Sequence, residues 1–224
     1  MNISIVIPAF NEETYISSCL RSLRSQTKAP YEIIVVDNNS TDKTSQIAKN
    51  YGAKVIFESK QSTIVSRNRG FGLARGEIIA RLDADTIAAA DWVERIGDNF
   101  KSKEIVALSG TAQFTGLGIV GQTDFYVNSF SRLLRNILKH NILIGPNMAI
   151  TKDVWSKIKD EVCIDQKKVH EDIDLSIHVA RYGKIAFDPK LKVKISARRI
   201  KSNPFSFFVE YPLRLYKTIQ NHRS

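Results

Sequence analysis

The amino-acid sequence predicts an α/β protein with a mostly parallel central sheet flanked by helices. Between residues 1 and 85, short runs of β-branched and other apolar residues alternate with segments of helical periodicity. Polar turn and cap residues separate these segments, and no internal repeat or low-complexity linker interrupts them. This alternation is typical of parallel strands joined by right-handed helical crossovers.

The first part of the chain carries the clearest form of this pattern. Its strands are expected at residues 3–7, 31–36, 54–57 and 77–82. The helices between them are expected around 16–23, at 41–50 and at 62–74. Ligands bind at the carboxyl ends of the strands in such sheets, so the polar residues that follow these strands are the candidates for a site.

The rest of the chain is expected to extend the same domain. Helices are expected at 91–101, 122–139, 151–157 and 170–182. Strands are expected at 105–110, 147–150, 185–187 and 193–195, with a glycine-bearing loop at 113–121. We therefore expect one domain over 1–197 and a basic, aromatic C-terminal extension over 198–224.

The composition is that of a folded globular protein with a positive charge. Of 224 residues, 43% are hydrophobic and 25% are charged, which excludes a disordered or fibrous chain. No apolar stretch approaches the roughly 18 residues of a membrane span, and the N-terminal apolar run resembles a buried strand more than a signal peptide. The two cysteines form no metal or disulfide pattern, so a cytoplasmic location is expected.

The formal net charge of +10 has several interpretations. It is compatible with binding to a nucleic acid, to an anionic membrane or to a phosphate-rich substrate, or with a contribution to solubility alone. The basic residues are scattered and no nucleic-acid motif is present, so we expect no nucleic-acid partner.

The turn after the first strand, Pro8-Ala9-Phe10-Asn11-Glu12, excludes two large enzyme classes. A dinucleotide-binding fold would carry G-x-G-x-x-G here, and a P-loop enzyme would carry G-x-x-x-x-G-K followed by Ser or Thr. This turn contains no glycine. Hydride transfer or ATP hydrolysis by those folds is therefore not expected.

Asp83-Ala84-Asp85 is the first candidate metal site. Carboxylates two residues apart can point the same way at the end of a strand and hold a hard divalent cation. The motif alone is weak, because one such pair is expected by chance and a second occurs at Asp172 and Asp174. The position directly after an expected buried strand favours a metal or nucleotide contact over a solvated loop.

Asp37 ends the second expected strand. It is either a turn residue that prepares the next helix or an acceptor for a base or ribose. The polar residues that follow it are expected to satisfy the turn without Asp37, which makes Asp37 surplus to helix capping and favours ligand contact.

An acidic run, His170-Glu171-Asp172, opens the helix expected at 170–182. Acidic residues at this position complement the helix dipole, which is the alternative to a functional role. A carboxylate here is also a candidate general base. His170 is either a metal ligand or a surface residue. Arg81 lies inside an expected buried strand, where pairing with a nearby carboxylate is one possibility.

Five collinear segments resemble inverting family 2 glycosyltransferases of the GT-A fold, the fold of nucleotide-diphospho-sugar transferases. They span roughly residues 3–189: SIVIPAFNEETYISSCLRSL, EIIVVDNNSTDKT, SRNRGFGLARGEIIARLDAD, GPNMAITKDVW and HEDIDLSIHVARYGKIAFDP. The resemblance implies that the nucleotide pocket is lined by Pro8, Ala9, Asn11, Glu12, Asp37, Arg67, Asn68 and Asp83. It further implies that Asp85, with Asp83, binds Mg²⁺ or Mn²⁺, that Asn147 approaches the acceptor, and that Asp172 of the Glu171-Asp172 pair is the catalytic base.

The implied reaction is metal-dependent transfer of one sugar from a nucleotide-diphospho-sugar, with UDP favoured, to a saccharide or lipid-linked acceptor. Cell-envelope glycan or glycolipid synthesis is the expected setting. The chain lacks the Q-x-x-R-W motif and the transmembrane helices of the family's processive synthases, so single-sugar transfer is favoured. The alternative functions are a nucleotide-sugar-binding protein without transferase activity and a basic nucleic-acid-binding protein.

The composition of the C-terminal extension has two interpretations. Arg198, Arg199 and Lys201 precede a tail rich in aromatic residues, a composition that fits a peripheral contact with the inner face of an anionic membrane. The alternative is a helix that packs its aromatic side chains on the core.

Overall fold

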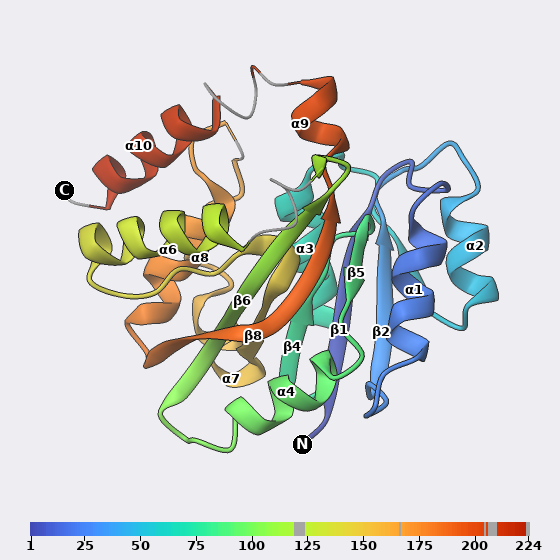
Figure 1. Ribbon diagram of the computed structural model, residues 1–224, viewed down its shortest axis with the longest axis horizontal. Helices are drawn as coiled ribbons and strands as arrows, with labels where there is room; N and C mark the ends of the chain where they lie inside the picture. The colour runs from blue at the N-terminus through green and yellow to red at the C-terminus, as the bar shows by residue number, and fades with distance from the viewer. Residues whose placement is uncertain (119–123, 166, 204, 206–209, 223–224) are drawn as a thin grey trace.

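The computed structural model describes residues 1–118, 124–165, 167–203, 205 and 210–222, with the backbone alone at 126, 199 and 211. One eight-stranded sheet runs through the molecule in the order β3-β2-β1-β4-β7-β6-β8-β5. Helices lie on both faces of this sheet, so the described chain forms three layers (Figure 1). The expected α/β class, with a central sheet flanked by helices, is confirmed.

The N-terminal half of the sheet is parallel. β1 (Ile3–Ala9) lies between β2 (Glu32–Asp37) and β4 (Ile78–Arg81), and β3 (Lys54–Phe57) lies outside β2. All three pairings are parallel. The crossovers are α1 (Ile16–Arg24), α2 (Thr44–Asn50) and α3 (Thr63–Leu73), as the alternating pattern predicts.

The C-terminal half makes the sheet mixed. β7 (Met148–Thr151) is antiparallel to both β4 and β6 (Ile105–Thr115). β8 (Lys184–Ser196) is parallel to β6, and the short edge strand β5 (Thr86–Ala88) is antiparallel to β8.

The two strands expected at 185–187 and 193–195 are one strand, β8. Its pairing with β6 skips between Asp188 and Lys192, which pair with the consecutive residues Gly110 and Thr111. Pro189 cannot donate to the ladder, so the intervening residues form a bulge that separates two apolar stretches of one strand. β6 also extends to residue 115 and takes the first part of the loop expected at 113–121, whose last three residues lie outside the described chain.

The remaining helices complete the layers. They are α4 (Trp92–Asn99), α6 (Phe125–Leu138), α7 (Lys152–Ile158), α8 (Glu171–Ala180), α9 (Arg198–Ser202) and α10 (Tyr211–Asn221), with a short 3-10 turn η1 (Gly145–Asn147). The helix expected at 122–139 corresponds to α6, and residues 122 and 123 lie outside the described chain.

Two apolar cores fill the space between sheet and helices. Alternate side chains of β1 point to opposite faces, so Ile3, Ile5 and Ile7 join the core beneath α1, α2 and α4, while Val6 joins the core beneath α3, α7 and α8. Burial of each such side chain contributes roughly 1.5–3 kcal/mol. Gly70 lets α3 approach the sheet closely, since a Cβ there would lie 2.3 Å from Cγ1 of Val6.

The described part of the C-terminal extension packs on the main body. Leu215 of α10 joins a small apolar cluster with Leu134, Ile142 and Ile173. Phe205 and Tyr216 are exposed, so these two aromatic side chains do not pack on the core. Phe207, Phe208 and the side chain of Tyr211 lie outside the described chain, and the boundary at residue 197 stays a prediction. Among the described helices, none has the length and apolar composition that a bilayer crossing requires.

Candidate active site

A cavity of about 800 Å³ opens where β4 ends and α8 begins. Its charged end is lined by Arg81, Asp83, Asp85, Glu171 and Asp172. Asp83 and Asp85 follow β4 directly, and α8 presents its first turn to them from the other side. Topology therefore brings together two acidic pairs that lie far apart in the sequence.

Arg81 holds these two acidic pairs together. One terminal nitrogen, Nη2, lies 3.0 Å from Oδ1 of Asp83 and 3.1 Å from Oε1 of Glu171, and Nη1 lies 3.5 Å from Oδ1 of Asp172. Burial of the guanidinium opposes its charge, but the carboxylates of Glu171, Asp83 and Asp172 outweigh this effect and raise the pKa of Arg81. The expectation that Arg81 pairs with a carboxylate is confirmed.

Arg67, a fully buried residue of α3, is a second cation in contact with Glu171. Its Nη1 lies 3.6 Å from Oε2 of Glu171, and its Nε donates a 3.0 Å hydrogen bond to Oδ1 of Asn68. Burial would raise the pKa of Glu171, but the charges of Arg81 and Arg67 prevail and lower it. Arg67 therefore supports Glu171, and the expected contact of Arg67 and Asn68 with the nucleotide stays a prediction.

Asp172 has the opposite environment. Burial of the carboxyl, followed by the adjacent charge of Glu171, raises the pKa of Asp172 to about 7, against the effect of Arg81 and Arg67. Its side chain lines the cavity and keeps 16% of its surface exposed. A carboxyl that titrates near neutral pH beside a cavity has the properties of a general base.

Gly145 in η1 orients Asp172, although no role is predicted for it from the sequence. Its backbone N–H donates a 3.0 Å hydrogen bond to Oδ2 of Asp172. A Cβ at this position would lie 2.8 Å from each carboxylate oxygen of Asp172, so only glycine fits without displacing the carboxylate. The Gly-Pro pair at 145–146 is the sequence signal for this turn.

Asn147 has a different place from the expected one beside the acceptor. Its side chain is fully buried, accepts a 2.8 Å hydrogen bond from the indole N–H of Trp92, and donates 2.8 Å hydrogen bonds to the carbonyls of Thr111 and Leu191. These bonds join η1 to α4, β6 and β8. Asn147 thus supports the loop that carries Gly145.

Arg198, expected only as part of the basic C-terminal extension, reaches the candidate metal ligands. Its guanidinium pairs with Glu12, lies 3.1 Å through Nε from Oδ2 of Asp85, and stacks 4.4 Å from the ring centroid of Tyr15. The candidate metal ligand Asp85 and the candidate nucleotide-binding residue Glu12 therefore share one cation from the C-terminal extension.

Two carboxylates, those of Glu12 and Asp85, contact Arg198, and Asp83 joins them in acting on the buried thiol of Cys19. Burial raises the pKa of the Cys19 thiol, and the negative charges of Asp85, Asp83 and Glu12 raise it further. A group of carboxylate oxygens is the donor set that Mg²⁺ and Mn²⁺ prefer. The residues present thus fit a hard divalent cation, provided that Asp85 releases Arg198.

The ends of β1 and β2 lie beside β4 in the sheet, and none of Pro8, Ala9, Asn11, Glu12 and Asp37 lines the cavity. Pro8 and Ala9 belong to β1, and Ala9 pairs with Asp37 of β2. Asn11, with φ of 52°, accepts a 2.9 Å hydrogen bond through Oδ1 from the N–H of Thr41, which joins the two strand-end loops.

Asp37 takes part in its own turn. Its carboxylate accepts a 3.1 Å hydrogen bond from the N–H of Ser40 and another from the hydroxyl of Ser45. Asp37 is therefore not surplus to the turn, contrary to the expectation. The helix that follows begins at Thr44, later than expected, and so Ser40 lies in the loop that Asp37 stabilises. Its contact with a base stays a prediction.

Solved structures identify the fold. The Pyrobaculum calidifontis mannosyltransferase PcManGT, solved in complex with GDP-Man and Mn²⁺, is similar over 100% of this chain and 64% of its own, with a TM-score of 0.76 and 17% identity. Residues 1–349 of S. aureus TarS, solved in complex with UDP-GlcNAc, are similar over 88% of this chain and 58% of that chain, with a TM-score of 0.68 and 20% identity. The fold is that of the GT-A glycosyltransferases.

Sequence comparison identifies the family. Residues 4–158 match the model of glycosyl transferase family 2. Glycosyltransferase AglE of Haloferax volcanii is 30% identical over 163 residues, which cover 68% of this chain and 53% of that protein. The chain belongs to glycosyl transferase family 2, as its motifs indicate, and spans about half the length of this relative.

Proposed function

We propose that this protein transfers one sugar from a nucleotide-diphospho-sugar to an acceptor hydroxyl, with inversion at the anomeric carbon. One observation carries the proposal: the carboxyl of Asp172, whose pKa is raised to about 7, lines the same cavity as Asp83 and Asp85. A base and a set of carboxylates for a metal diphosphate are the two requirements of a single-displacement transfer.

The ends of β1 and β2, which neighbour β4 in the sheet, are the proposed nucleotide-binding surface. We assign it to Pro8, Ala9, Asn11, Glu12 and Asp37, with Asp83 near the ribose. UDP is the first nucleotide to test, and the UDP-GlcNAc and GDP-Man complexes of the fold neighbours define the range of donors for a screen.

Asp85, with Asp83, is the proposed ligand pair for Mg²⁺ or Mn²⁺. When bound, the cation supplies positive charge that stabilises the diphosphate leaving group. The Mn²⁺ in the PcManGT complex supports this assignment.

The residues of this chain carry out the proton transfer. The carboxylate of Asp172 accepts the proton of the acceptor hydroxyl while the hydroxyl oxygen bonds to the anomeric carbon and the bond to the diphosphate breaks. The N–H of Gly145 and the guanidinium of Arg81 hold the carboxylate of Asp172 in place. The negative charge of Glu171 raises the affinity of Asp172 for a proton.

The opposite end of the cavity supports an acceptor with an apolar body. This end is lined by Phe114, Val127, Phe130, Ile142 and Leu215, which lie on β6, α6, the loop before η1 and α10. We therefore favour a lipid-linked acceptor over a free saccharide.

A location at the inner face of the cell membrane follows from such an acceptor. Exposed apolar side chains, Leu133 and Ile137 of α6 and Leu213 and Tyr216 of α10, surround this end of the molecule. They lie among exposed basic residues such as Arg132 and Lys217, a combination that favours anionic lipid surfaces.

Donor turnover tests the proposal. The wild type is expected to hydrolyse or transfer sugar from a UDP- or GDP-sugar with Mn²⁺, and Asp172→Asn and Asp85→Ala are each expected to lose about 10²-fold or more of kcat. The exposed Asp153→Asn serves as the matched control and should retain full activity.

Two outcomes would contradict the assignments. Full transfer by both variants would remove Asp172 and Asp85 from the mechanism. Tight UDP binding without turnover over a broad acceptor panel would favour a nucleotide-sugar-binding protein.

A further inference from the structure

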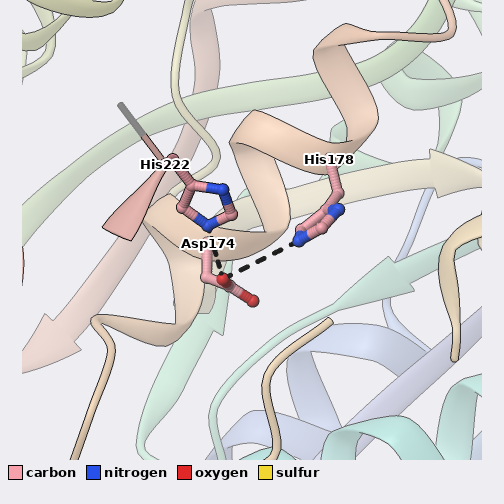
Figure 2. Close-up of side chains that lie close together, drawn as sticks. All are labelled: Asp174, His178 and His222. Atoms are coloured by element: carbon pink, nitrogen blue, oxygen red, sulfur yellow. Dashed lines mark hydrogen bonds and ion pairs between the residues drawn. The ribbon is translucent and has the colours of Figure 1, made fainter. Parts of the chain in front are cut away.

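Asp174, His178 and His222 form a second cluster of metal-ligating side chains outside the candidate active site. Asp174 and His178 lie one turn apart on α8, and His222 follows α10. Each offers one ligand atom, and the three atoms lie within 4.8 Å of one another. Figure 2 shows both imidazole rings with a nitrogen turned toward the same carboxylate oxygen of Asp174.

The cluster is shielded from solvent. The side chains of Asp174, His178 and His222 are 3%, 8% and 17% exposed. The second carboxylate oxygen of Asp174, Oδ2, accepts a 2.9 Å hydrogen bond from the N–H of Cys163, which leaves Oδ1 for the two histidines. The carboxylate is therefore fixed in orientation before any ligand arrives.

The two ring nitrogens of His178 face different partners. Nδ1 lies 3.2 Å from Oε2 of Glu161 and 3.5 Å from a nitrogen of Arg181. Nε2 faces Oδ1 of Asp174 at 3.8 Å, beyond hydrogen-bond distance. When Nδ1–H is donated to Glu161, Nε2 presents its lone pair to this carboxylate oxygen, and a cation between the two atoms would bind both.

We propose that Nε2 of His178, Nε2 of His222 and Oδ1 of Asp174 bind a zinc ion. Zinc takes imidazole nitrogen and carboxylate oxygen in tetrahedral sites, where neighbouring ligand atoms are about 3.3 Å apart for bonds of about 2.0–2.1 Å. The observed distances of 2.9 Å from Asp174 to His222 and 3.8 Å from Asp174 to His178 bracket that value. A water molecule or another small ligand completes the fourth position.

Glu161 gives the proposed site the outer shell that zinc histidines use. Metal-bound imidazoles donate their other N–H to a carboxylate, which orients the ring and raises its basicity. Glu161 does this for His178 and is itself paired with Arg181, whose Nη1 lies 3.3 Å from Oε2. Imidazole ligands also favour zinc over Mg²⁺, so this site differs in metal preference from Asp83 and Asp85.

A zinc ion here would join the C-terminal helix to the helix that carries the proposed base. α8 begins at Glu171 and Asp172, and the hydroxyl of Thr218 in α10 already accepts a 2.7 Å hydrogen bond from the N–H of His170. The ion would fix the two helices at a second point, one to two turns further along α8.

Cobalt substitution tests the site. The full chain, without a polyhistidine tag, is stripped with a chelator and titrated with Co²⁺ in excess Mg²⁺, which occupies oxygen-only sites. We expect the intense visible absorption of a low-symmetry Co²⁺ site, complete at one equivalent and displaced by Zn²⁺. His178→Ala and His222→Gln should each abolish it, and Glu161→Gln should lower zinc affinity about 10- to 100-fold.

Two control variants separate this site from others. Asp85→Ala, which removes the proposed active-site ligand, should leave the Co²⁺ absorption unchanged, and so should His140→Ala, which removes a histidine outside the cluster. Zinc should also raise the melting temperature of the wild type and not that of His222→Gln. Absence of the absorption in the wild type, or its retention in both His178→Ala and His222→Gln, would overturn the proposal and leave a metal-free Asp–His hydrogen bond.

Discussion

Adjacent carboxyl groups at the start of α8 have pKa values shifted in opposite directions. Glu171 contacts two buried arginines, Arg81 and Arg67, and stays ionised. Asp172 experiences burial and the charge of Glu171, and these effects outweigh the same two arginines. At neutral pH, one carboxyl therefore remains a fixed charge while its neighbour can exchange a proton, which is the division of roles that acid–base enzymes require.

The pKa of Asp172 predicts an acidic limb in the activity profile, where activity falls as the pH is lowered. Only the ionised carboxyl can accept a proton, so kcat/KM should rise through pH 7 and be about tenfold below its plateau at about pH 6. Glu171→Gln removes the negative neighbour and should move this limb to lower pH. Rates measured with saturating metal across the range check this, and a flat profile in the wild type would contradict it.

Gly145→Ala should lower kcat strongly while it lowers the free energy of unfolding little. The added Cβ would lie 2.8 Å from both oxygens of Asp172 and would displace the carboxylate, at a cost of about 10²-fold in kcat. Gly72→Ala is the matched control, because a Cβ at Gly72 meets nothing within 4 Å. Equal kinetics for the two variants would mean that the position of Asp172 tolerates this shift.

Arg81→Met should destabilise the folded state strongly. The change leaves Asp83, Glu171 and Asp172 without their shared cation, and loss of one partner from a buried ion pair costs about 3–5 kcal/mol. Urea denaturation measures this loss. The exposed Arg75→Met, which breaks the pair with Glu32 and the contact of the guanidinium with the Tyr31 ring, should cost about 1 kcal/mol and serves as the control.

The order of the first strands and helices could be predicted, because each element carries its own apolar period. The acidic candidates could also be located, because Asp83 and Asp85 follow a buried strand and Asp172 opens a helix. Gly145 and Arg198 could not be found, since their roles depend on packing between distant segments: Arg198 is 113 residues from Asp85 and 186 from Glu12. The hydrogen bonds of Asn147 could not be predicted for the same reason, because its partners belong to three other elements.

At the scale of elements, α9 brings the start of the C-terminal extension to the candidate metal ligands. This short helix follows β8 directly, and its first residue, Arg198, contacts Glu12 after β1 and Asp85 after β4. β8 reaches this position because it continues past its bulge as one strand. A strand that ended at 187 would not deliver Arg198 to the site.

Arg198→Gln should strengthen Mn²⁺ binding. The guanidinium occupies carboxylates that the proposed metal requires, and hydrogen bonds between charged groups contribute about 1.5–3 kcal/mol, so affinity should rise at least about tenfold. Mn²⁺ titration followed by electron paramagnetic resonance measures this, with the exposed Lys201→Gln on the same helix as control. Unchanged or weaker Mn²⁺ binding would show that Arg198 does not compete with the cation.

At the scale of the whole molecule, positive net charge and an acidic site coexist. The chain carries a formal charge of +10, although carboxylates dominate the candidate site. The excess basic residues therefore lie mainly elsewhere, including the exposed surface around α6 and α10 that also carries apolar side chains.

This surface predicts binding to anionic membranes. The protein should float with vesicles that contain anionic lipid and dissociate as salt rises, since each basic residue near such a surface contributes about 1 kcal/mol. Leu133→Ser, Leu213→Ser and Tyr216→Ser combined should reduce flotation, whereas the exposed Ile87→Ser on the edge strand β5, outside α6 and α10, should not. Equal recovery of wild type with neutral and anionic vesicles would contradict the proposal.

The contact of Arg198 with Glu12 and Asp85 has a thermodynamic consequence. If the metal and Arg198 exclude each other, any ligand that draws Arg198 away must raise the affinity for the metal, and the metal must raise the affinity for that ligand by the same factor. A lipid phosphate that binds the basic start of the extension is such a ligand. Reciprocal linkage of this kind would make the protein load its metal preferentially at the surface that holds its acceptor.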